Sequence, residues 1–483
     1  MMKNTMKNTM KNFWSAFFKD RIFFATLIQL ALPIALQNLL INSLSFVDTV
    51  MIGRLGAPEI AAVGLGNQVF FMFILILFGV GSGGAIFVSQ YWGKQDITNI
   101  RRSQGICLVL ASGVALLFGL LSLIIPEGLI GLFSPDPEVI RLGAAYQRIT
   151  AISYIFTAIS FTYAIVLRSV EQARLPLYVT AVSLAFNVVL NYIFIFGMGP
   201  LPPLGVSGAA LGTTISRGIE MILLLFLVYK PFNGKKGALP IPLRGPAAAS
   251  FRELLSFDRS FIGRYFKTAA PVIMNEIAWG GGMTVYKAIY ARVGTEALAS
   301  INIAETVINL FFVLLIGSSN ATAVMIGKVI GQGDIKKARE YSLRLSILGP
   351  AMGVLISIGL LLIARPVTGF FNVPANVKAS AAAIMGLTAV WIPFKAFTIH
   401  LVVGIFRGGG DTKFGLFLDL FGVWAIGIPI TLIGGLHLGL AVPLVYFLAG
   451  SEEAVKMIIG LPRLLSGKWA NDLTVPDVSV NRG

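Results

Sequence analysis

Long apolar runs alternate along the chain with short polar turns, and they define the expected architecture. Each run is long enough for a helix that crosses a bilayer, which needs about 20 apolar residues. The runs predict helices at residues 25–52, 58–87, 104–125, 138–166, 175–197, 205–229, 263–291, 296–327, 342–364, 377–405, 415–434 and 441–463. The last is the least regular, because Glu452 and Glu453 interrupt it. The pattern predicts an all-α membrane protein with twelve transmembrane helices.

The first half of the chain is repeated in the second. Residues 31–96 align without a gap on residues 269–334, at an offset of 238, with a proline, turn glycines and an aspartate in register. Arg168 and Arg407 form a further pair at an offset of 239. Each half holds an even number of helices, so both copies run the same way through the membrane. We expect two pseudo-symmetric six-helix bundles, with a substrate site between them near mid-membrane.

The repeat divides the chain into five segments. They are an N-terminal tail (1–24), an N-lobe (25–229), a connector rich in Pro, Lys and Arg (230–262), a C-lobe (263–463) and a C-terminal tail (464–483). The N-terminal stretch is repetitive and basic, and it lacks the apolar core and cleavage site of a signal peptide. We therefore expect a cytoplasmic tail that meets the membrane surface.

Composition and charge support this topology. Hydrophobic residues make up 56% of the chain and charged residues 12%, against roughly 25% charged in soluble domains. Mean hydropathy is +0.82. Tails and loops on the N-terminal side, together with the adjoining ends of the helices, hold 28 of the 38 Lys and Arg, and the opposite side holds five. This asymmetry predicts a multi-pass protein of the cytoplasmic membrane with both termini inside. It accounts for the net charge of +16 without a nucleic acid partner.

Candidate chemistry in the first half centres on Asp48, because a carboxylate inside a bilayer is costly and marks a functional site. Gln37 shares its helix face, and Asn38 lies beside that face. The fifth helix carries Asn187 and Asn191 one turn apart on one face. The sixth carries Thr213 and Thr214, followed by Arg217 and Glu220, which are spaced to neutralise each other.

These groups suit a cation. One carboxylate, two amide oxygens and a hydroxyl form a ligand set for a hard monovalent ion, so we expect Na⁺ at Asp48, Asn187, Asn191 and Thr214. A proton would need the carboxylate alone. The oxygen-rich set favours Na⁺ slightly over H⁺. One cysteine and two histidines leave little for a metal cluster, and we expect no cofactor.

The second half carries a different set of polar groups. They are candidates for substrate binding or a second coupling site: Glu276, Tyr286, Lys287, Asn302, Glu305, Asn309 and Lys395. Tyr286 occupies the repeat position of Asp48, and Asn38 occupies that of Glu276. The lobes are therefore not expected to be chemically equivalent. A closed pair of glutamate and lysine is the plainer interpretation, and Asp419 is expected near the membrane interface.

The order of several short motifs resembles the multidrug and toxic compound extrusion (MATE) transporters over residues 25–470. The motifs are ALP at 31–33, FVDTVMIGRLG at 46–56, WGKQD at 92–96, GVSGAALGTT at 205–214, AAPVIMNE at 269–276, IGKVIGQGD at 326–334, FRGGGDTKF at 406–414 and SGKW at 466–469. The resemblance implies two six-helix lobes around a central cavity. It also implies a monomer that exports cationic, amphipathic drugs and dyes, driven by inward Na⁺ or H⁺.

The resemblance also suggests roles for individual residues. Asp48 looks like the first-helix carboxylate of the family, with Asn187, Asn191 and Thr213 or Thr214 as its partners. Glu276 looks like the seventh-helix acid of the C-lobe. Some members pair that acid with another on the tenth helix, where this chain has Lys395 or Ala396, and this suggests an ion pair between Glu276 and Lys395.

The leading hypothesis is a cation-coupled exporter that works by alternating access. A lipid-linked oligosaccharide flippase of the same superfamily is the alternative, but it would need a cationic cavity, and here acids balance the bases within the membrane. A membrane-embedded enzyme would need more than His400 inside a span. A passive channel fits poorly with a charge distribution that differs between the two halves.

Overall fold

The computed structural model describes residues 20–230 and 245–475. The N-terminal tail up to residue 19, the part of the connector at 231–244 and the end of the C-terminal tail at 476–483 lie outside the described residues, so the predictions for them stay untested. Within the described ranges the regular structure is helical, apart from one β-bridge between Met198 and Leu201.

The first half forms eight helices. They are α2 (Arg21–Gly53), α3 (Ala57–Lys94), α4 (Ile97–Ile124), α5 (Pro126–Gly131), α6 (Pro137–Thr150), α7 (Ser153–Ser169), α8 (Arg174–Phe196) and α9 (Gly205–Tyr229). The helix predicted at residues 138–166 is in fact two, because α6 and α7 meet at a bend of 52°. The other predicted helices of this half are present, with ends displaced by up to seven residues.

The connector leads into the second half. Its described part contains α10 (Phe251–Leu254), and the second half consists of α11 (Arg259–Val293), α12 (Thr295–Gly331), α13 (Ile335–Thr368), α14 (Ala375–Ile399), α15 (Thr412–Leu420), α16 (Ile428–Leu432), α17 (Val442–Ala449) and α18 (Ser451–Ser466). Short π-helical segments, η1 (His400–Phe406), η2 (Phe421–Gly427) and η3 (Ile433–His437), follow α14, α15 and α16. The helix predicted at 441–463 is broken at Gly450.

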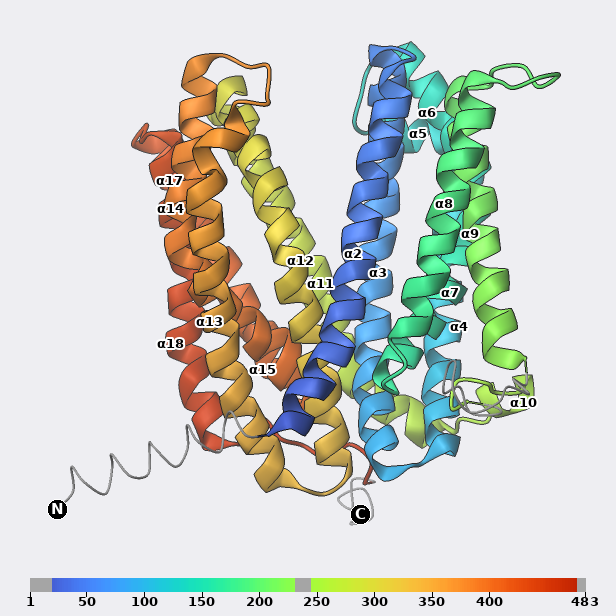
Figure 1. The fold of residues 1–483 in the computed structure, drawn as a ribbon, viewed down its shortest axis with the longest axis vertical. Helices are drawn as coiled ribbons and strands as arrows, with labels where there is room; N and C mark the ends of the chain where they lie inside the picture. Colours follow the sequence, from blue (N-terminus) through green and yellow to red (C-terminus); the bar gives the residue numbers. More distant parts are fainter. Residues whose placement is uncertain (1–19, 231–244, 476–483) are drawn as a thin grey trace.

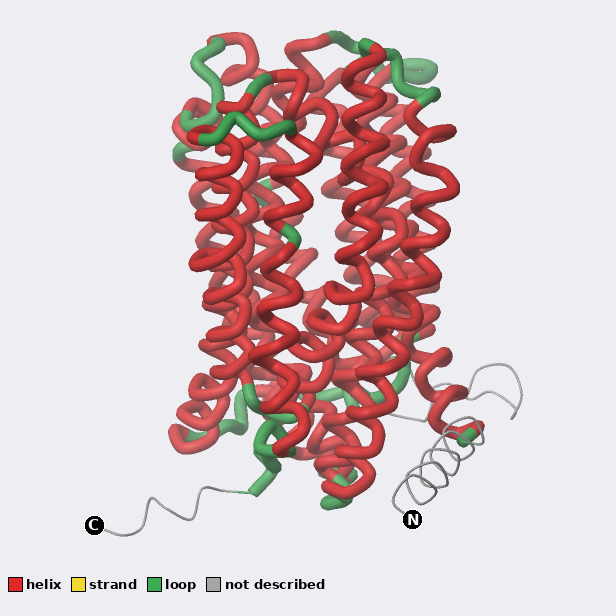
Figure 2. The backbone as a smooth tube through the Cα atoms, turned by 90° about the vertical axis from the view of Figure 1, so that its left-hand side faces the viewer, coloured by secondary structure: helices red, strands yellow, loops and turns green. Residues whose placement is uncertain are grey.

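Twelve membrane crossings result. Nine of the described helices, some joined through their π-helical segments, are long and apolar enough to span a bilayer, and the bent pair α6–α7 makes a tenth. Helix α11, which carries many charges, and the broken pair α17–α18 complete the set. The first and second halves stand side by side as two lobes, and they converge at one end and diverge at the other (Figure 1; Figure 2).

The ends of the helices follow the sequence repeat. Asp20 and Asp96 cap the starts of α2 and α4, where each carboxylate accepts a backbone N–H three residues ahead. Asp258 and Asp334, 238 residues later, cap α11 and α13 in the same way. All four helices start at the end of the molecule where the lobes converge. We call it the basic end, because Arg101, Lys328 and Arg344 lie there.

The lobes touch through closely packed glycines near the basic end. A Cβ on Gly93 would lie 2.0 Å from the carbonyl oxygen of Lys328, and one on Gly331 would lie 1.8 Å from that of Gln90. Gly331 and Lys328 are the repeat mates of Gly93 and Gln90, so the two contacts are reciprocal. Helices α3 and α12 therefore cross on a pseudo-twofold axis, at a distance that only glycine allows.

Three polar contacts close the basic end. Lys328 of α12 donates to both carboxylate oxygens of Glu171, in the α7–α8 turn, over 2.8 and 2.7 Å. Arg344 of α13 donates to Asp20 over 2.8 Å. The segment after α18 crosses to the other lobe, where Gln90 donates to the carbonyl of Asn471 and accepts from the N–H of Leu473. Charged and backbone groups of both lobes thus hold this end together.

Candidate functional site

The N-lobe polar groups predicted from the sequence form one connected cluster between α2, α8 and α9. Asn191 Nδ2 donates to Asp48 Oδ1 over 2.8 Å and to Asn187 Oδ1 over 3.1 Å. Asn187 in turn donates to Ser216 Oγ over 3.0 Å and to Thr213 Oγ1 over 3.5 Å. The two asparagines are buried and Asp48 is half-buried. The cluster brings one carboxylate together with amide and hydroxyl oxygens.

Thr214 is engaged elsewhere. Its hydroxyl donates to the carbonyls of Ala210 and Ile149, at 2.8 and 3.1 Å, rather than to the asparagines. Ser216, which the sequence did not single out, takes its place beside Asn187. Nothing in the sequence pattern marked Ser216 as a candidate, because serine is common in apolar helices, where its hydroxyl usually donates to a carbonyl of the preceding turn.

One acceptor of the cluster has no donor. Asn191 Oδ1 is buried and has no hydrogen-bond partner within the described part of the chain. It lies against Gly212 of α9, where an added Cβ would stand 2.2 Å away. A buried amide oxygen without a donor costs free energy, on the order of 1–3 kcal/mol. Such an oxygen is an available ligand for a cation, and Gly212 provides the space for its amide.

A second network of hydrogen bonds in the N-lobe begins at Gln37, which was predicted to share a helix face with Asp48. Gln37 accepts from Arg168 Nη2 over 2.6 Å and donates to Thr180 Oγ1 over 2.8 Å. Thr180 donates to Glu220, which also forms the expected ion pair with Arg217, at 2.9 Å. This chain of contacts thus joins four helices of the N-lobe: α2, α7, α8 and α9.

The C-lobe holds a related network with more carboxylates. At an offset of 238, Gln37 corresponds to Asn275, which precedes Glu276, and at an offset of 239 Arg168 corresponds to Arg407, Thr180 to Asp419 and Arg217 to Lys456. Glu276 pairs with Arg407 at 2.6 Å, and Asp419 accepts from Asn275 over 3.0 Å and lies 3.9 Å from Lys456. Asp419 is therefore half-buried against the lobe interior, and its expected position near the membrane interface stays a prediction. Glu276 pairs with Arg407 rather than with Lys395.

Buried acids surround Lys456. Its Nζ lies 3.1 Å from Glu453 and 3.5 Å from Glu452, and all three side chains are buried. Glu452 also accepts from the hydroxyl of Tyr286 over 2.9 Å, and Glu453 accepts from Thr398 over 2.5 Å. The break between α17 and α18 thus carries two carboxylates into the core of the lobe.

Lys395 is exposed and stands over the ring of Phe312, 4.7 Å from its centre, and its charge acts on Glu452 and Glu453. The remaining candidates do not join this cluster. Lys287, Asn302 and Asn309 are exposed, and Glu305 and Asn38 are half-buried. His400 is buried, with its two ring nitrogens 2.7 Å from the carbonyl oxygen of Ala396 and 2.9 Å from Ser318 Oγ. The second half thus holds several separate polar contacts rather than one site.

Two central arginines were missed as functional groups. Arg168 and Arg407 were assigned to cytoplasmic loops, yet both are bonded to side chains of the long helices α2, α3 and α11. Their spacing at the repeat offset was the signal that could have found them.

Comparisons with known proteins agree with this architecture. The family profile described as MatE matches residues 33–193 and 271–433, which is one segment in each lobe. The chain is 29% identical to "Probable multidrug resistance protein NorM" of Deinococcus radiodurans, covering 83% of this chain and 86% of the relative. It is 23% identical to "Uncharacterized transporter YisQ" of Bacillus subtilis, covering 92% and 94%. "Crystal structure of MATE in complex with MaL6" superposes with a TM-score of 0.82, at 18% identity, over 92% of this chain and 96% of that one.

Proposed function

The chain belongs to the MatE family of multi-pass membrane transporters, and from that premise we propose that it exports cationic, amphipathic compounds by antiport with Na⁺ or H⁺. Several relatives carry the name multidrug resistance protein, which supports drugs and dyes as the substrate class and does not favour the lipid-linked oligosaccharide flippase. We place the protein in the cytoplasmic membrane as a monomer, with the basic end inside the cell.

The observation that carries the coupling proposal is the contact between Asp48 and Asn191. The amide nitrogen of Asn191 lies where oxygens of Asp48 and Asn187 converge, while its own oxygen has no donor among residues 20–230 and 245–475. Turning an amide by half a revolution exchanges its nitrogen for its oxygen at almost no cost in space. Asp48, Asn187 and Asn191 would then present three oxygens to one Na⁺. A proton on Asp48 is the simpler alternative, and the neutral oxygens favour Na⁺.

Coupling requires that the ion bind the two states of the lobes unequally. Helix α2 carries Asp48 in its diverging half, whereas Leu30 and Ile34 in its other half are buried near the second lobe. An ion that draws α2 toward α8 and α9 therefore acts on the helix that also touches the C-lobe. In the proposed cycle the described arrangement is outward-facing, and closing the diverging half opens the basic end to the cytoplasm.

The test is transport by purified protein in liposomes, with ethidium as the fluorescent lipophilic cation. Na⁺ and pH gradients are imposed separately. We expect movement of ethidium under one of them, and the effective gradient identifies the coupling ion. Asp48→Asn should abolish this movement. Full gradient-driven export by Asp48→Asn would overturn the assigned role.

A steric pair of variants isolates the asparagine amide. Gly212→Ala places a Cβ where Asn191 Oδ1 now lies, so the ion concentration for half-maximal transport should rise about tenfold. Gly218→Ala on the same helix is the matched control, because its Cβ would be 3.5 Å from the ring of Phe156, an ordinary contact. Equal behaviour of the two variants would remove Asn191 from the ion site.

A further inference from the structure

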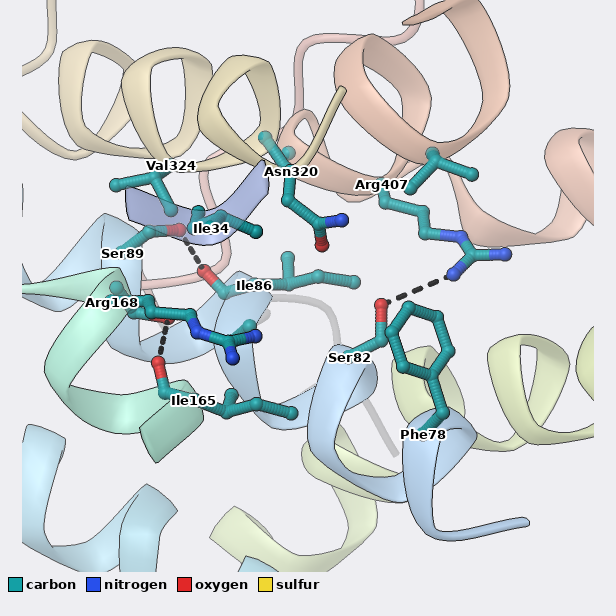
Figure 3. Close-up of a pocket in the computed structure, with 15 residues that line it drawn as sticks. Ile34, Phe78, Ser82, Ile86, Ser89, Ile165, Arg168, Asn320, Val324 and Arg407 are labelled. Carbon is teal, nitrogen blue, oxygen red and sulfur yellow. Dashed lines mark hydrogen bonds between the residues drawn. The ribbon is translucent and has the colours of Figure 1, made fainter. Parts of the chain in front are cut away.

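A pocket lies between the lobes, on the pseudo-twofold axis. The side chains around it come in repeat-related pairs, at offsets of 238 or 239: Ser82 with Asn320, Ala85 with Ala323 and Arg168 with Arg407. Both arginines and Asn320 reach into the same space (Figure 3). We call it the arginine pocket. Because both lobes contribute to its wall, rocking of the lobes must reshape it.

The two arginines differ in how they are neutralised. Arg407 donates to the carboxylate of Glu276 over 2.6 Å and to Ser82 over 3.2 Å. Arg168 donates to Gln37, a neutral amide that precedes the repeat mate of Glu276 on α2. No ion pair of Arg168 occurs within the described ranges, and its Nε is buried there without a hydrogen-bond partner. One guanidinium of the pocket is thus bonded to an amide instead of a carboxylate, and Glu220 acts on it only through space.

The nearest acid of the N-lobe does not fill this role. Glu220 is joined to Gln37 only through the hydroxyl of Thr180, and it already pairs with Arg217 at 2.9 Å. Taking a cation out of water without a partner is expensive, and an anion that enters the pocket recovers part of that cost. Guanidinium groups present planar donors that match a carboxylate.

We propose that the arginine pocket binds the carboxylate of a transported compound, so that the preferred substrates are amphipathic zwitterions rather than simple cations. The inference rests on the proposed function and specifies its substrate class. The cavity measures about 40 Å³, room for about three water molecules, which is the size of a carboxylate group. The rest of the compound, with its positive charge, extends into the diverging half of the molecule.

A matched pair of dyes tests the proposal. Tetramethylrhodamine carries a cationic ring system and a free benzoate, and its methyl ester keeps the cation but lacks the carboxylate. Binding of each dye to the purified full-length protein is measured by fluorescence anisotropy. We expect the wild type to bind the zwitterion about tenfold more tightly than the ester. Equal affinity in the wild type, or tighter binding of the ester, would overturn the proposal without any variant.

Two substitutions assign the effect to the pocket. Arg168→Gln should lower the ratio of the two affinities about tenfold, and Arg168→Lys, which keeps the charge but loses the planar donors, should lower it less. Arg148→Gln is the control, because Arg148 forms an exposed ion pair with Glu127 away from the pocket. Binding of the ester by each variant verifies that it is folded. A ratio that Arg168→Gln leaves unchanged would contradict the assignment.

A free anion such as chloride could neutralise the arginines in the same way as a substrate carboxylate. Binding measured with and without chloride distinguishes the two. Replacing sodium chloride by sucrose at equal osmolarity should leave the ratio of affinities unchanged or raise it slightly. If the ester binds only when chloride is present, the pocket belongs to a free anion and the substrate assignment is overturned. The proposed function fails separately, through absence of gradient-driven ethidium transport.

Discussion

The ion pair between Glu171 and Lys328 provides a quantitative test of how the lobes are held together. Two contacts of 2.7 and 2.8 Å join the ammonium to the carboxylate, and Trp92 Nε1 donates to the same carboxylate over 3.1 Å. The side chains are 24% and 29% exposed, so the pair lies between an exposed pair worth less than about 1 kcal/mol and a buried one worth about 3–5 kcal/mol when broken. We take about 1.4 kcal/mol as the free energy that the pair contributes to closing the basic end. Loss of that amount changes the equilibrium between closed and open basic ends about tenfold.

The backbone at Glu171 supports a functional reason for this residue. Its φ is +64°, and its repeat mate Gly410 has φ +75°. A side chain at such a φ is disfavoured, typically by about 1 kcal/mol or more. The carboxylate is thus present although glycine would fit the turn better, and the contact with the other lobe compensates for the strain.

The assay is a double-mutant cycle read by distances between spin labels. Labels are attached through cysteines at the exposed positions Lys94 and Lys336, one on each lobe. Glu171→Gln removes the charge and keeps an acceptor for Trp92, and Lys328→Gln removes its partner. Each variant should increase the population with a long distance about tenfold, and the double variant should add little to either.

Strict additivity of the two substitutions would show that the side chains do not act as a pair and would refute the reasoning. An unchanged distance distribution in both single variants would do the same. The exposed pair of Arg148 and Glu127, substituted in the same way, is the control and should leave the distances unchanged.

Three further predictions concern stability. Gly93→Ala should lower the thermal midpoint and slow transport, since its Cβ meets backbone 2.0 Å away at a cost of about 1–3 kcal/mol, whereas Gly113→Ala, with open space around it, should not. Burial alone would raise the pKa of Asp20, but the N–H of Phe23 and the Arg344 guanidinium hold that pKa below its usual value. The thermal midpoint of the wild type should therefore fall as pH drops through this lowered pKa. In Asp20→Asn, which has no carboxylate to protonate, the midpoint should fall less. Glu453→Gln should destabilise by about 3 kcal/mol in denaturation by heat, because Lys456 loses its nearest carboxylate, and an unchanged midpoint would contradict this.

The hydrophobic pattern was sufficient for the twelve crossings, because the bilayer imposes a length and polarity on every span. It did not reveal where the helices end. Helix α13 begins at Ile335, seven residues before the predicted start, since Asp334 caps a turn that lies beyond the apolar run. The bend between α6 and α7 also escaped prediction, whereas the break at Gly450 lies beside Glu452 and Glu453, which had marked the last helix as the least regular.

Side chains that meet along neighbouring helices were predictable, and those that meet across the molecule were not. Asp48, Asn187 and Asn191 stood out as polar groups at helical spacing within apolar runs. Glu452 and Glu453 were taken only as an interruption, although their spacing from Lys456 is that of helical ion pairs. Nothing local reveals that Tyr286 and Thr398 also bond to them. The repeat carried more long-range information than hydropathy did, because offsets of 238 and 239 relate both central arginines and several of the groups around them.

The segment after α18 has a consequence for how the protein is made. Asn471 and Leu473 bond to Gln90, and Gln90 also donates to the carbonyl of Gly408. These residues leave the ribosome only after both lobes have been inserted. Until then the amide of Gln90 lacks two of its three partners, so the basic end cannot be completed during synthesis. A chain that is released after residue 466 should therefore insert both lobes but hold them together less tightly than the full chain does.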